Sequence, residues 1–508
     1  MFSSVRKVEH LLPGMPEQTF APLSDHQMPP IYHYYNGKEW IASSSGKTAE
    51  ITSPVDGGII GKLQVVTERE IDTVLENIRK TQLSWEATPL YSRVKIMHLT
   101  ADWIRQMEEY LTTLLSKEIG KTQSEAKSEI VRTADLIDYI ADEAVSLRGE
   151  TLDSDNFPGF EKGRTAIIER VAHGTVLCIA PFNYPVNLSA SKIVPALLMG
   201  NCVVFKPPTQ GGISGLHLAQ LFLKAGLPEG VFSVVTGGGG DIGDYLVKHP
   251  LVHMIAFTGS SDVGLGIAEK ASMIPLLFEC GGNNPSLVLP DADMEMTARE
   301  IIKGGFSYAG QRCTAIKYVL GTQNTLDALF PIILTNMKDM VVMGDPRNPE
   351  TKLVGPVISE SAARKVQSTI DEAVGQGAQV VIGGKTEGSY VEPTILKNVK
   401  PEMKVVATEV FGPVISFINV NSIDEAIAII NNSTYGLQAS VFTKDEGTGM
   451  VIAKKINVGT VQINGSPQRG PDHFPFMGVK HSGLGVQGVR YSLEAMSRLK
   501  STVINKPT

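Results

Sequence analysis

Residues 202–235 read CVVFKPPTQGGISGLHLAQLFLKAGLPEGVFSVV. Two short apolar runs, at 203–205 and 231–235, stand on either side of a helical segment at 214–225. Apolar runs that are spaced by about one helix are typical of βαβ units, whose strands lie parallel in one sheet. The quoted stretch therefore predicts an α/β fold.

The same alternation extends to both sides of this stretch. After Gly282 it begins again, with a strand at 286–289, a helix from about Met294 and further alternation to 461–464, which predicts a second sheet domain. Two or more domains are also expected because 508 residues exceed what one core usually supports. The remaining strands of the first sheet are expected at 176–180, 254–257 and 276–278, and its other helices at 188–199, 241–248 and 262–271.

The two ends of the chain lack this alternation. Residues 1–31 contain five prolines and are expected to form an irregular surface arm, followed by a strand over 34–42. A Thr67-Glu-Arg-Glu70 capping box predicts the start of a helix, and further helices are expected at about 91–118 and 125–147. The β-branched run at 499–505 has no strand near it in the sequence, so it is expected to pair elsewhere, for example on another subunit.

The composition narrows the classes of function. A net charge of −7 without a basic stripe gives no reason to expect a nucleic-acid or anionic-membrane partner. The four cysteines are widely spaced and form no CxxC pair, which favours a reducing compartment. No apolar run approaches the ~18 residues of a membrane span, and the N-terminus lacks the apolar core of a signal peptide. The expected location is the cytoplasm.

Three glycine-rich or lysine-bearing turns are candidate phosphate sites. Gly238, Gly240 and Gly243 match GxGxxG, but the acidic residue expected about 20 residues later is missing, so a plain strand-to-helix turn remains an alternative. The turn at 257–264 opens a helix, whose N-terminal amides favour a phosphate, although an ordinary capped turn has the same sequence features. Lys206 ends a parallel strand, at the edge where such sheets bind ligands, unless it is a solvated loop lysine.

Two other residues suggest chemistry. Cys313 follows Arg312, whose charge favours a thiolate with a lowered pKa, although a single cysteine is often a small buried apolar residue. Glu279 ends an apolar strand, where a carboxylate is costly unless it is paired or useful; the alternative is a strand end that faces solvent. The sequence has no HExxH, no zinc-type Cys/His spacing and no GxSxG, so neither metal-dependent nor serine-hydrolase chemistry is expected.

In combination, six motifs resemble the aldehyde dehydrogenase superfamily from about residue 34 onward. They are Pro181-Phe-Asn183, Lys206, Phe257-Thr-Gly-Ser260, Glu279-Cys-Gly-Gly282, Gln311-Arg-Cys313 and Glu409-Val-Phe-Gly-Pro413, in this order. The resemblance implies a Rossmann-type nucleotide domain at 34–148 and 169–283, an α/β catalytic domain at 284–489 and a small β oligomerisation arm at 149–168 and 490–508, with 1–33 as the N-terminal arm. It also implies a homo-oligomer, either a dimer or a tetramer.

The resemblance implies covalent catalysis. Cys313 would attack the aldehyde, the Asn183 amide and the Cys313 N–H would hold the oxyanion, and Glu279 would activate water to hydrolyse the thioester. The implied cofactor is NADP, because Thr209 stands where NAD-preferring relatives often carry a glutamate that repels a 2′-phosphate. The implied cofactor-binding residues are Lys206, Thr209, Gly239, Thr258, Gly259, Ser260, Val263, Cys280, Glu409 and Phe411. No metal is implied. Cys280 and Asn283 depart from the leucine and lysine usual in the family.

Within the superfamily, the segments at 181–188, 206–210 and 468–476 resemble the non-phosphorylating glyceraldehyde-3-phosphate dehydrogenases. The positions that match that subfamily's phosphate-binding residues are Arg132, Tyr184, Arg312 and Arg469, and Thr314 is included with them as a substrate contact. Several guanidinium groups suit a phosphate dianion, but Arg312 and Arg469 would also bind the carboxylate of a semialdehyde. A catalytically silent relative is a more distant alternative, against which the joint presence of Cys313, Glu279 and Asn183 argues.

Overall fold

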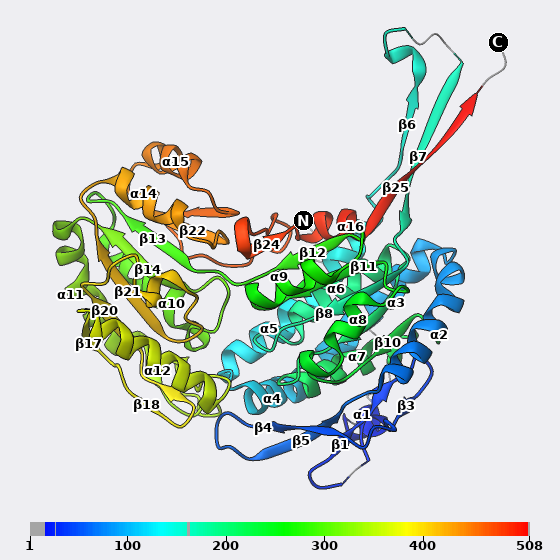
Figure 1. The fold of residues 1–508 in the computed structure, drawn as a ribbon, viewed down its shortest axis with the longest axis horizontal. Helices are drawn as coiled ribbons and strands as arrows, with labels where there is room; N and C mark the ends of the chain where they lie inside the picture. Colours follow the sequence, from blue (N-terminus) through cyan, green and yellow to red (C-terminus); the bar gives the residue numbers. More distant parts are fainter. Residues whose placement is uncertain (1–15, 26, 160–162, 506–508) are drawn as a thin grey trace.

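The computed structural model describes residues 16–25, 27–159 and 163–505, and its first large sheet confirms the predicted parallel strands (Figure 1). Strands β12 to β10 pair in parallel, whereas β24 and β2 add antiparallel edges. Its order is β24 (Gly483–Leu484), β12 (Leu276–Glu279), β11 (Met254–Thr258), β8 (Thr175–Ile179), β9 (Cys202–Lys206), β10 (Phe232–Val234), β2 (Tyr34–Tyr35) and β3 (Trp40–Ile41).

The strand order of this sheet reverses direction at β8. From β8 the chain moves through β9 to β10, then crosses back to β11 and continues to β12. Right-handed crossovers therefore place the helices of the two halves on opposite faces of the sheet. They are α6 (Asn187–Leu198) and α7 (Gly212–Lys224) on one face, and α8 (Asp244–Lys248) and α9 (Ser261–Lys270) on the other. Open α/β sheets bind ligands beside such a reversal, at the carboxyl ends of the strands, which here is the edge between β8 and β11.

The second large sheet confirms the predicted restart of the alternation after Gly282. Its strand order is β17 (Gln379–Ile382), β20 (Thr394–Lys397), β21 (Val414–Asn419), β14 (Ile316–Gly321), β13 (Asn284–Val288), β22 (Gln438–Phe442) and β23 (Thr460–Ile463). All of its pairings are parallel except that of β17 with β20. The helices of this part are α10 (Met294–Phe306), α11 (Gln323–Met340), α12 (Glu360–Gly375), α13 (Lys404–Ala407), α14 (Ile423–Asn432) and α15 (Glu446–Lys455).

Helices that precede the first sheet pack against it and against one another. The Thr67 hydroxyl accepts from the Glu70 N–H and the Glu70 carboxylate from the Thr67 N–H, so the predicted capping box starts α2 (Glu68–Glu86). The helix expected over 91–118 is divided at Met107, whose backbone angles (φ −97°, ψ 14°) leave the helical region. The resulting helices are α3 (Leu90–Gln106) and α4 (Glu108–Ile119), and they are followed by α5 (Gln123–Ala144).

The N-terminal region is more regular than the sequence predicted. The arm expected to be irregular contains α1 (Pro16–Phe20), and β1 (Ile31–Tyr32) pairs with β5 (Ile59–Gln64) beside β4 (Thr48–Thr52). The strand expected over 34–42 is instead the β2–β3 hairpin. It turns at Asn36, whose side-chain oxygen accepts from the Lys38 and Glu39 N–H groups, and at Gly37 with φ +98°. These local bonds compete with a continuous strand.

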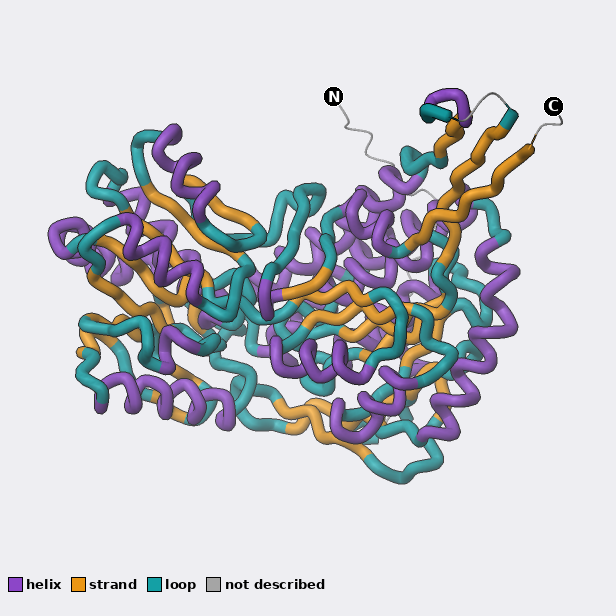
Figure 2. The backbone as a smooth tube through the Cα atoms, turned by 45° about the horizontal axis from the view of Figure 1, so that its top comes forward, coloured by secondary structure: helices purple, strands orange, loops and turns teal. Residues whose placement is uncertain are grey.

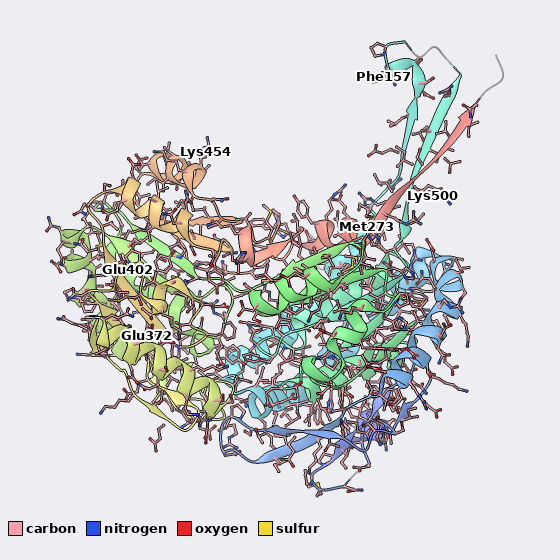
Figure 3. All side chains as sticks on the ribbon, in the orientation of Figure 1. Phe157, Met273, Glu372, Glu402, Lys454 and Lys500 are labelled. Carbon is pink, nitrogen blue, oxygen red and sulfur yellow. The ribbon has the colours of Figure 1, made fainter. Side chains whose placement is uncertain are left out.

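The C-terminal run was expected to pair away from its neighbours in sequence, for example on another subunit, and in the structure it pairs with a distant strand of its own chain. Strand β25 (Ser497–Asn505) pairs antiparallel with β7 (Arg164–Ala172) along its whole length, and β6 (Glu150–Asp153) pairs with the other edge of β7. The three strands project from the body as one arm (Figures 1 and 2). Phe157 lies near the far end of the arm with 66% of its surface exposed, and Lys500 lies on β25 (Figure 3).

Between residues 16 and 505, within the described ranges, no helix is both long enough and apolar enough to cross a membrane. The same ranges hold no cluster of three or more His, Cys, Asp or Glu side chains that could bind a metal ion.

Candidate active site

A pocket of about 610 Å³ opens at the reversal point of the first sheet. Its walls come from the turns that follow β8 and β11, from the start of α12 and from the loop that precedes β14. Most of the predicted site residues meet here: Asn183, Thr209, Thr258, Gly259, Ser260, Val263, Cys280, Cys313, Glu409 and Phe411. The pocket therefore joins the two large sheets, because Asn183 follows the first sheet and Cys313 leads into the second.

A left-handed turn presents Cys313 to this pocket. Tyr308, Ala309 and Gly310 have positive φ angles of 51°, 49° and 67°, a conformation that costs energy for residues with a Cβ. The turn is held from two sides. The Glu125 carboxylate accepts from the Tyr308 N–H at 2.7 Å, and the buried Lys317 ammonium donates to the Gly310 carbonyl at 2.7 Å. These buried charges offset the strain of the turn that carries the cysteine.

Replacing Gly310 by alanine should destabilise this turn and lower activity. A Cβ at this position would overlap the Gly412 carbonyl oxygen, and φ +67° is unfavourable for alanine. We expect the free energy of unfolding to fall by about 2 kcal/mol or more. Thermal melting measures the loss. Gly375→Ala is the matched control because a Cβ there meets no atom within 4 Å, and it should leave the melting temperature nearly unchanged. Equal melting temperatures for the two variants would contradict the argument.

The electrostatic surroundings of Cys313 differ from the expectation. Burial is the largest influence and raises the pKa of the Cys313 thiol, and the nearby carboxylates of Glu279 and Glu409 raise it further. Arg469 and Arg312 lower this pKa, but by less than the other groups raise it. Arg312 thus lowers the pKa of Cys313 as predicted, but burial and the two carboxylates outweigh it, so the net shift favours the thiol. The carbonyl of Cys313 is fixed by the Asn284 amide at 2.8 Å.

Asn183 lies in the turn between β8 and α6, and its side-chain amide donates to the Gln311 carbonyl at 3.0 Å. The start of α6 is capped by a carboxylate from another helix: Glu129 of α5 accepts from the Val186 N–H at 3.0 Å and from the Asn187 N–H at 3.1 Å. The fully buried Lys121 forms an ion pair with Glu129. The Asn183 amide thus bonds to the residue two positions before Cys313 in the sequence. The loop that carries Asn183 is anchored by the buried charges of Glu129 and Lys121.

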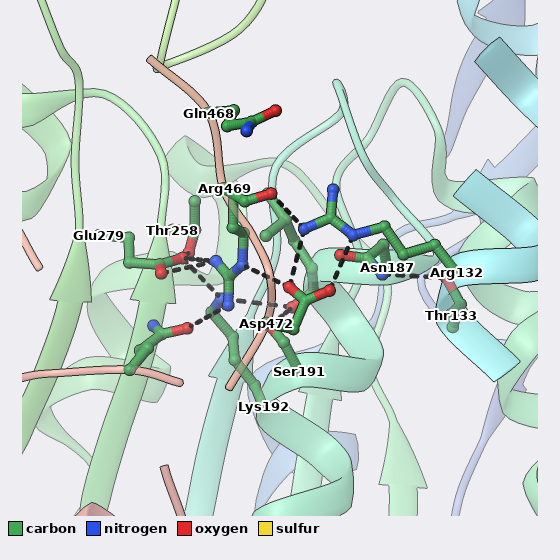
Figure 4. Close-up of polar contacts among 12 residues, drawn as sticks. Arg132, Thr133, Asn187, Ser191, Lys192, Thr258, Glu279, Gln468, Arg469 and Asp472 are labelled. Carbon is green, nitrogen blue, oxygen red and sulfur yellow. Dashed lines mark hydrogen bonds and ion pairs between the residues drawn. The ribbon is translucent and has the colours of Figure 1, made fainter. Parts of the chain in front are cut away.

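Glu279 ends β12 beneath the pocket, and only 2% of its surface is exposed. Its carboxylate accepts from the Thr258 hydroxyl at 3.0 Å and from Arg469 Nη1, which lies 2.6 Å from Oε1 and 2.7 Å from Oε2 (Figure 4). The Lys192 ammonium, fully buried in α6, is 3.9 Å from Oε2. Burial lowers the pKa of Lys192 to about 8, and Glu279 opposes that shift. Of the two alternatives predicted for Glu279, a paired carboxylate or a strand end that faces solvent, the structure therefore shows the paired carboxylate.

The predicted phosphate-binding residues do not form one cluster of free guanidinium groups: Arg312, Arg469 and Tyr184 lie near Cys313, whereas Arg132 contacts Asp472 and Arg469. Arg132 binds Asp472 with two hydrogen bonds of 2.8 Å and also donates to the Arg469 carbonyl (Figure 4). Arg312 donates to the Gly304 carbonyl at 2.7 Å, whereas its buried Nε has no partner among the described residues. Tyr184 packs against Lys121, whose ammonium lies 3.4 Å from the ring centroid. Thr314 is buried.

The cofactor side of the pocket has features that fit a dinucleotide. Helix α9 begins after Ser260 without a side-chain cap, and Gly259, Ser260 and Val263 line the pocket beside it. Its first amides are therefore available to a pyrophosphate. The buried hydroxyl of Ser261 also lacks a hydrogen-bond partner among the described residues. Near Thr209, burial lowers the pKa of Lys206 to about 8, and Asp241 opposes that shift. These residues could hold the phosphates and ribose of such a cofactor.

Gly239, Glu409 and Cys280 were all predicted to bind the cofactor, and the structure gives each of them different neighbours. Gly239 lies in a short π-helix (Gly239–Gly243) and does not line the pocket. Glu409 accepts from the Gly282 N–H at 3.2 Å. Burial raises the pKa of Glu409 and lowers that of Lys317, and the attraction between the two groups opposes both shifts. Cys280 lines the pocket, and its sulfur lies where a side chain at Gly264 would collide with it.

Sequence reasoning missed several residues of the site. Lys192 had a visible signal, because it is a charged residue in the otherwise apolar helix α6. Lys317 similarly lies in the buried strand β14. Lys365, from the exposed side of α12, lines the pocket and gave no signal, since it follows an ordinary amphipathic pattern. Gln487 and Asp472, which contact Arg469, also gave no signal in the sequence.

The chain belongs to the aldehyde dehydrogenase family, which it matches over residues 40–502. It is similar to the NADP-dependent glyceraldehyde-3-phosphate dehydrogenase of Pisum sativum, with 43% identity over 94% of this chain and 96% of that protein. The solved structure of the Bacillus halodurans NADP-dependent glyceraldehyde-3-phosphate dehydrogenase, complexed with NADP, superposes with a TM-score of 0.91 at 44% identity and covers 94% of this chain and 99% of its own.

A third relative carries a different substrate in its name. The sulfoacetaldehyde dehydrogenase of Neptuniibacter caesariensis is 36% identical over 90% of this chain and 99% of that protein. The three comparisons confirm the resemblance on which the expected fold rests: Rossmann-type and catalytic α/β domains of the aldehyde dehydrogenase kind.

Proposed function

We propose that the protein oxidises glyceraldehyde 3-phosphate to 3-phosphoglycerate with NADP, through a thioester on Cys313 and without inorganic phosphate. The observation that carries this proposal is the position of Cys313, which shares one pocket with the Asn183 amide and lies among Arg312, Arg469 and Tyr184. Cationic groups around the nucleophile suit a small anionic aldehyde, and the relatives above that act on glyceraldehyde 3-phosphate favour the phosphorylated one.

The first half of the reaction forms the thioester. The small thiolate fraction of Cys313 attacks the aldehyde carbon, and the new oxyanion accepts hydrogen bonds from the Asn183 amide and the Cys313 N–H. The Asn183 amide nitrogen carries two N–H groups, so one can serve the oxyanion while the other stays on the Gln311 carbonyl. Bound NADP supplies the hydride acceptor. Oxidation of the adduct leaves the acyl group on sulfur.

The second half releases the acid. Glu279 takes a proton from water, the water oxygen bonds to the acyl carbon, and the carbon–sulfur bond breaks. The departing sulfur then regains a proton, which restores the Cys313 thiol. Thr258 holds the Glu279 carboxylate through a hydrogen bond of 3.0 Å, so the base keeps its orientation while its other contacts change.

An NADPH absorbance assay tests the proposal. The purified protein is given NADP with D-glyceraldehyde 3-phosphate, in a buffer that either contains or lacks inorganic phosphate. We expect turnover in both buffers and a free acid as product, and we expect kcat/KM for glyceraldehyde 3-phosphate to exceed that for unphosphorylated D-glyceraldehyde by at least about 100-fold, because a phosphate forms several charge-assisted hydrogen bonds. Turnover that depends on phosphate buffer, or equal kcat/KM values, would overturn the proposal.

A second candidate substrate class is a small aldehyde with another anionic group, such as a semialdehyde or sulfoacetaldehyde. The unpartnered Nε of Arg312 would serve a carboxylate or a sulfonate as well as a phosphate. The similarity to a sulfoacetaldehyde dehydrogenase favours this candidate specifically. The same assay with succinic semialdehyde and sulfoacetaldehyde ranks the three anions by kcat/KM.

NADP is the cofactor, and Thr209 is proposed to set the preference for it over NAD. Thr209 lines the pocket and carries no charge, so it does not repel a 2′-phosphate. A Thr209→Glu variant should lower the ratio of kcat/KM with NADP to kcat/KM with NAD by roughly 100-fold, because juxtaposed like charges cost several kcal/mol. Thr209→Gln is the control for side-chain size and should change the ratio far less. An unchanged ratio in Thr209→Glu would show that other residues set the preference.

We also propose that the arm formed by β6, β7 and β25 joins copies of the chain into a dimer or tetramer. Among the described residues the outer edges of the arm pair with no further strand, and apolar side chains such as Leu152, Leu499 and Val503 are each more than half exposed on it. Light scattering after size-exclusion chromatography measures the mass, and a monomer at micromolar concentration would contradict this proposal.

A further inference from the structure

The carboxylate of Glu279 is engaged in a way that opposes its use as a base. Arg469 Nη1 lies within 2.7 Å of both carboxylate oxygens, and 3% of the Glu279 side chain is exposed. Arg469 Nη1 occupies both oxygens of the carboxylate and the Thr258 hydroxyl also occupies Oε2, so little of the carboxylate is open to a water molecule. In this arrangement Glu279 is well oriented but poorly placed to accept a proton from water.

Arg469 lies between Glu279 and the other side of the site. Its Nη2 donates to the Gln487 side chain at 3.1 Å, and its Nε is 3.6 Å from Asp472. It lines a separate hollow of about 20 Å³ with Phe474 and Phe476, whereas Cys313 lines the large pocket. A space of this size holds about one water molecule.

The contacts of Arg469 can be exchanged for those of a substrate anion. Glu279 offers it one negative charge, whereas a phosphate group offers about two charges and several acceptor oxygens. Asp472 is already engaged by two hydrogen bonds from Arg132, so it competes only weakly for Arg469 (Figure 4). A bound anion can thus take the guanidinium away from Glu279.

We propose that Arg469 latches Glu279 and that the anionic group of the substrate releases it. This inference rests on the proposed function, because it requires an anionic aldehyde. Once Arg469 has moved, Glu279 still accepts from Thr258 and still has the Lys192 ammonium 3.9 Å away, so it stays in place. Hydrolysis then proceeds: Glu279 takes a proton from water, the carbon–oxygen bond forms, the carbon–sulfur bond breaks, and the proton passes to the sulfur of Cys313.

The latch makes hydrolysis depend on the substrate's charge and not only on its affinity. A neutral aldehyde of the same length can form the thioester, but it leaves Arg469 on Glu279, so its acyl group should leave slowly. An anion supplied as a separate molecule should then restore fast hydrolysis without any change in the aldehyde.

The experiment supplies the substrate in two pieces to the full-length protein. The acyl-enzyme is formed with D-glyceraldehyde and NADP and freed of excess aldehyde. Its hydrolysis is followed by intact-protein mass spectrometry in buffers that contain phosphite, methanesulfonate, acetate or chloride at equal ionic strength. We expect phosphite to accelerate hydrolysis by about 100-fold over chloride, at the lower end of a general base's usual contribution.

Two variants separate the latch from simple anion binding. In Arg469→Ala, hydrolysis without phosphite should approach the phosphite-stimulated rate of the parent protein, and phosphite should add nothing. Arg490→Ala is the matched control, since Arg490 pairs with Glu143 and Glu494 and not with Glu279. Arg490→Ala should keep both the slow unassisted rate and the phosphite effect of the parent protein. Because the parent protein alone shows or lacks the phosphite effect, the test does not depend on the folding of either variant.

The outcomes distinguish the latch from the proposed function. If glyceraldehyde 3-phosphate has no advantage over glyceraldehyde in kcat/KM, the proposed substrate is wrong, and acceleration by methanesulfonate or acetate instead of phosphite would retain the latch with another anion. If glyceraldehyde 3-phosphate is preferred but none of the three anions speeds hydrolysis, the latch is overturned and Arg469 serves binding alone.

Discussion

With every aldehyde, a Cys313→Ser protein should produce NADPH at no more than about 10⁻⁴ of the parent's rate, because removal of a covalent nucleophile costs at least this much. A serine hydroxyl is a far weaker nucleophile than a thiol, and burial together with the carboxylates of Glu279 and Glu409 would oppose its ionisation, as they oppose that of Cys313. The measurement is the steady-state rate with saturating NADP and glyceraldehyde 3-phosphate.

Mass spectrometry of the quenched protein extends this prediction. The parent protein should carry the mass of an acyl group on the peptide that contains Cys313, and the serine variant should carry none. Cys202→Ala serves as the control, because Cys202 is buried at the start of β9 and has no part in the proposed chemistry. A serine variant as active as the parent would show that Cys313 is not the nucleophile and would remove the covalent mechanism.

A Glu279→Gln protein should form the thioester and then stop. An amide of the same shape still accepts a hydrogen bond from Arg469 but cannot take a proton from water. We expect kcat to fall by about 10² to 10⁴, the usual contribution of a general base, while a first turnover of NADPH remains visible. Rapid mixing should show a burst of one NADPH per active site, followed by a slow steady rate.

The control for this variant is Glu143→Gln, which removes a partly exposed carboxylate that lies 3.5 Å from Arg490 and should leave kcat unchanged. Accumulated thioester on the Glu279→Gln protein, seen by mass spectrometry, would support a role in hydrolysis. A variant that shows no burst would contradict this assignment, because Glu279 would then act before or during acylation.

Features that depend on residues close in sequence could be predicted. The Thr67 and Glu70 capping box lies within one turn, and its hydrogen bonds start α2 as expected. The parallel strands of the first sheet were recognisable because each is a short apolar run with one helix on either side. The site residues were predicted from motifs and from the order of these motifs along the chain, and most of them line the pocket.

Features that depend on distant residues could not be predicted. Arg469 and Glu279 are 190 positions apart, and no local pattern shows that one grips the other. The net rise in the pKa of Cys313 has the same origin, because Arg312, which lowers this pKa, is its sequence neighbour, whereas Glu409, which raises it, meets Cys313 only in the fold. Local sequence patterns showed no partner for β25, because β7 lies more than 300 positions earlier in the chain; only the family resemblance placed the two segments in one arm.

The short crossing between the two large sheets has a further consequence. The base ends β12 of one sheet at Glu279, and β13 of the other sheet begins at Asn284, next to the turn that fixes Cys313. Each half of the molecule therefore carries one of the two proposed reacting groups, and we expect that neither half produced separately could complete a catalytic cycle. A tilt of one half against the other would change the spacing of the proposed nucleophile and base, so residues 280–283, which join β12 to β13, help to fix that spacing.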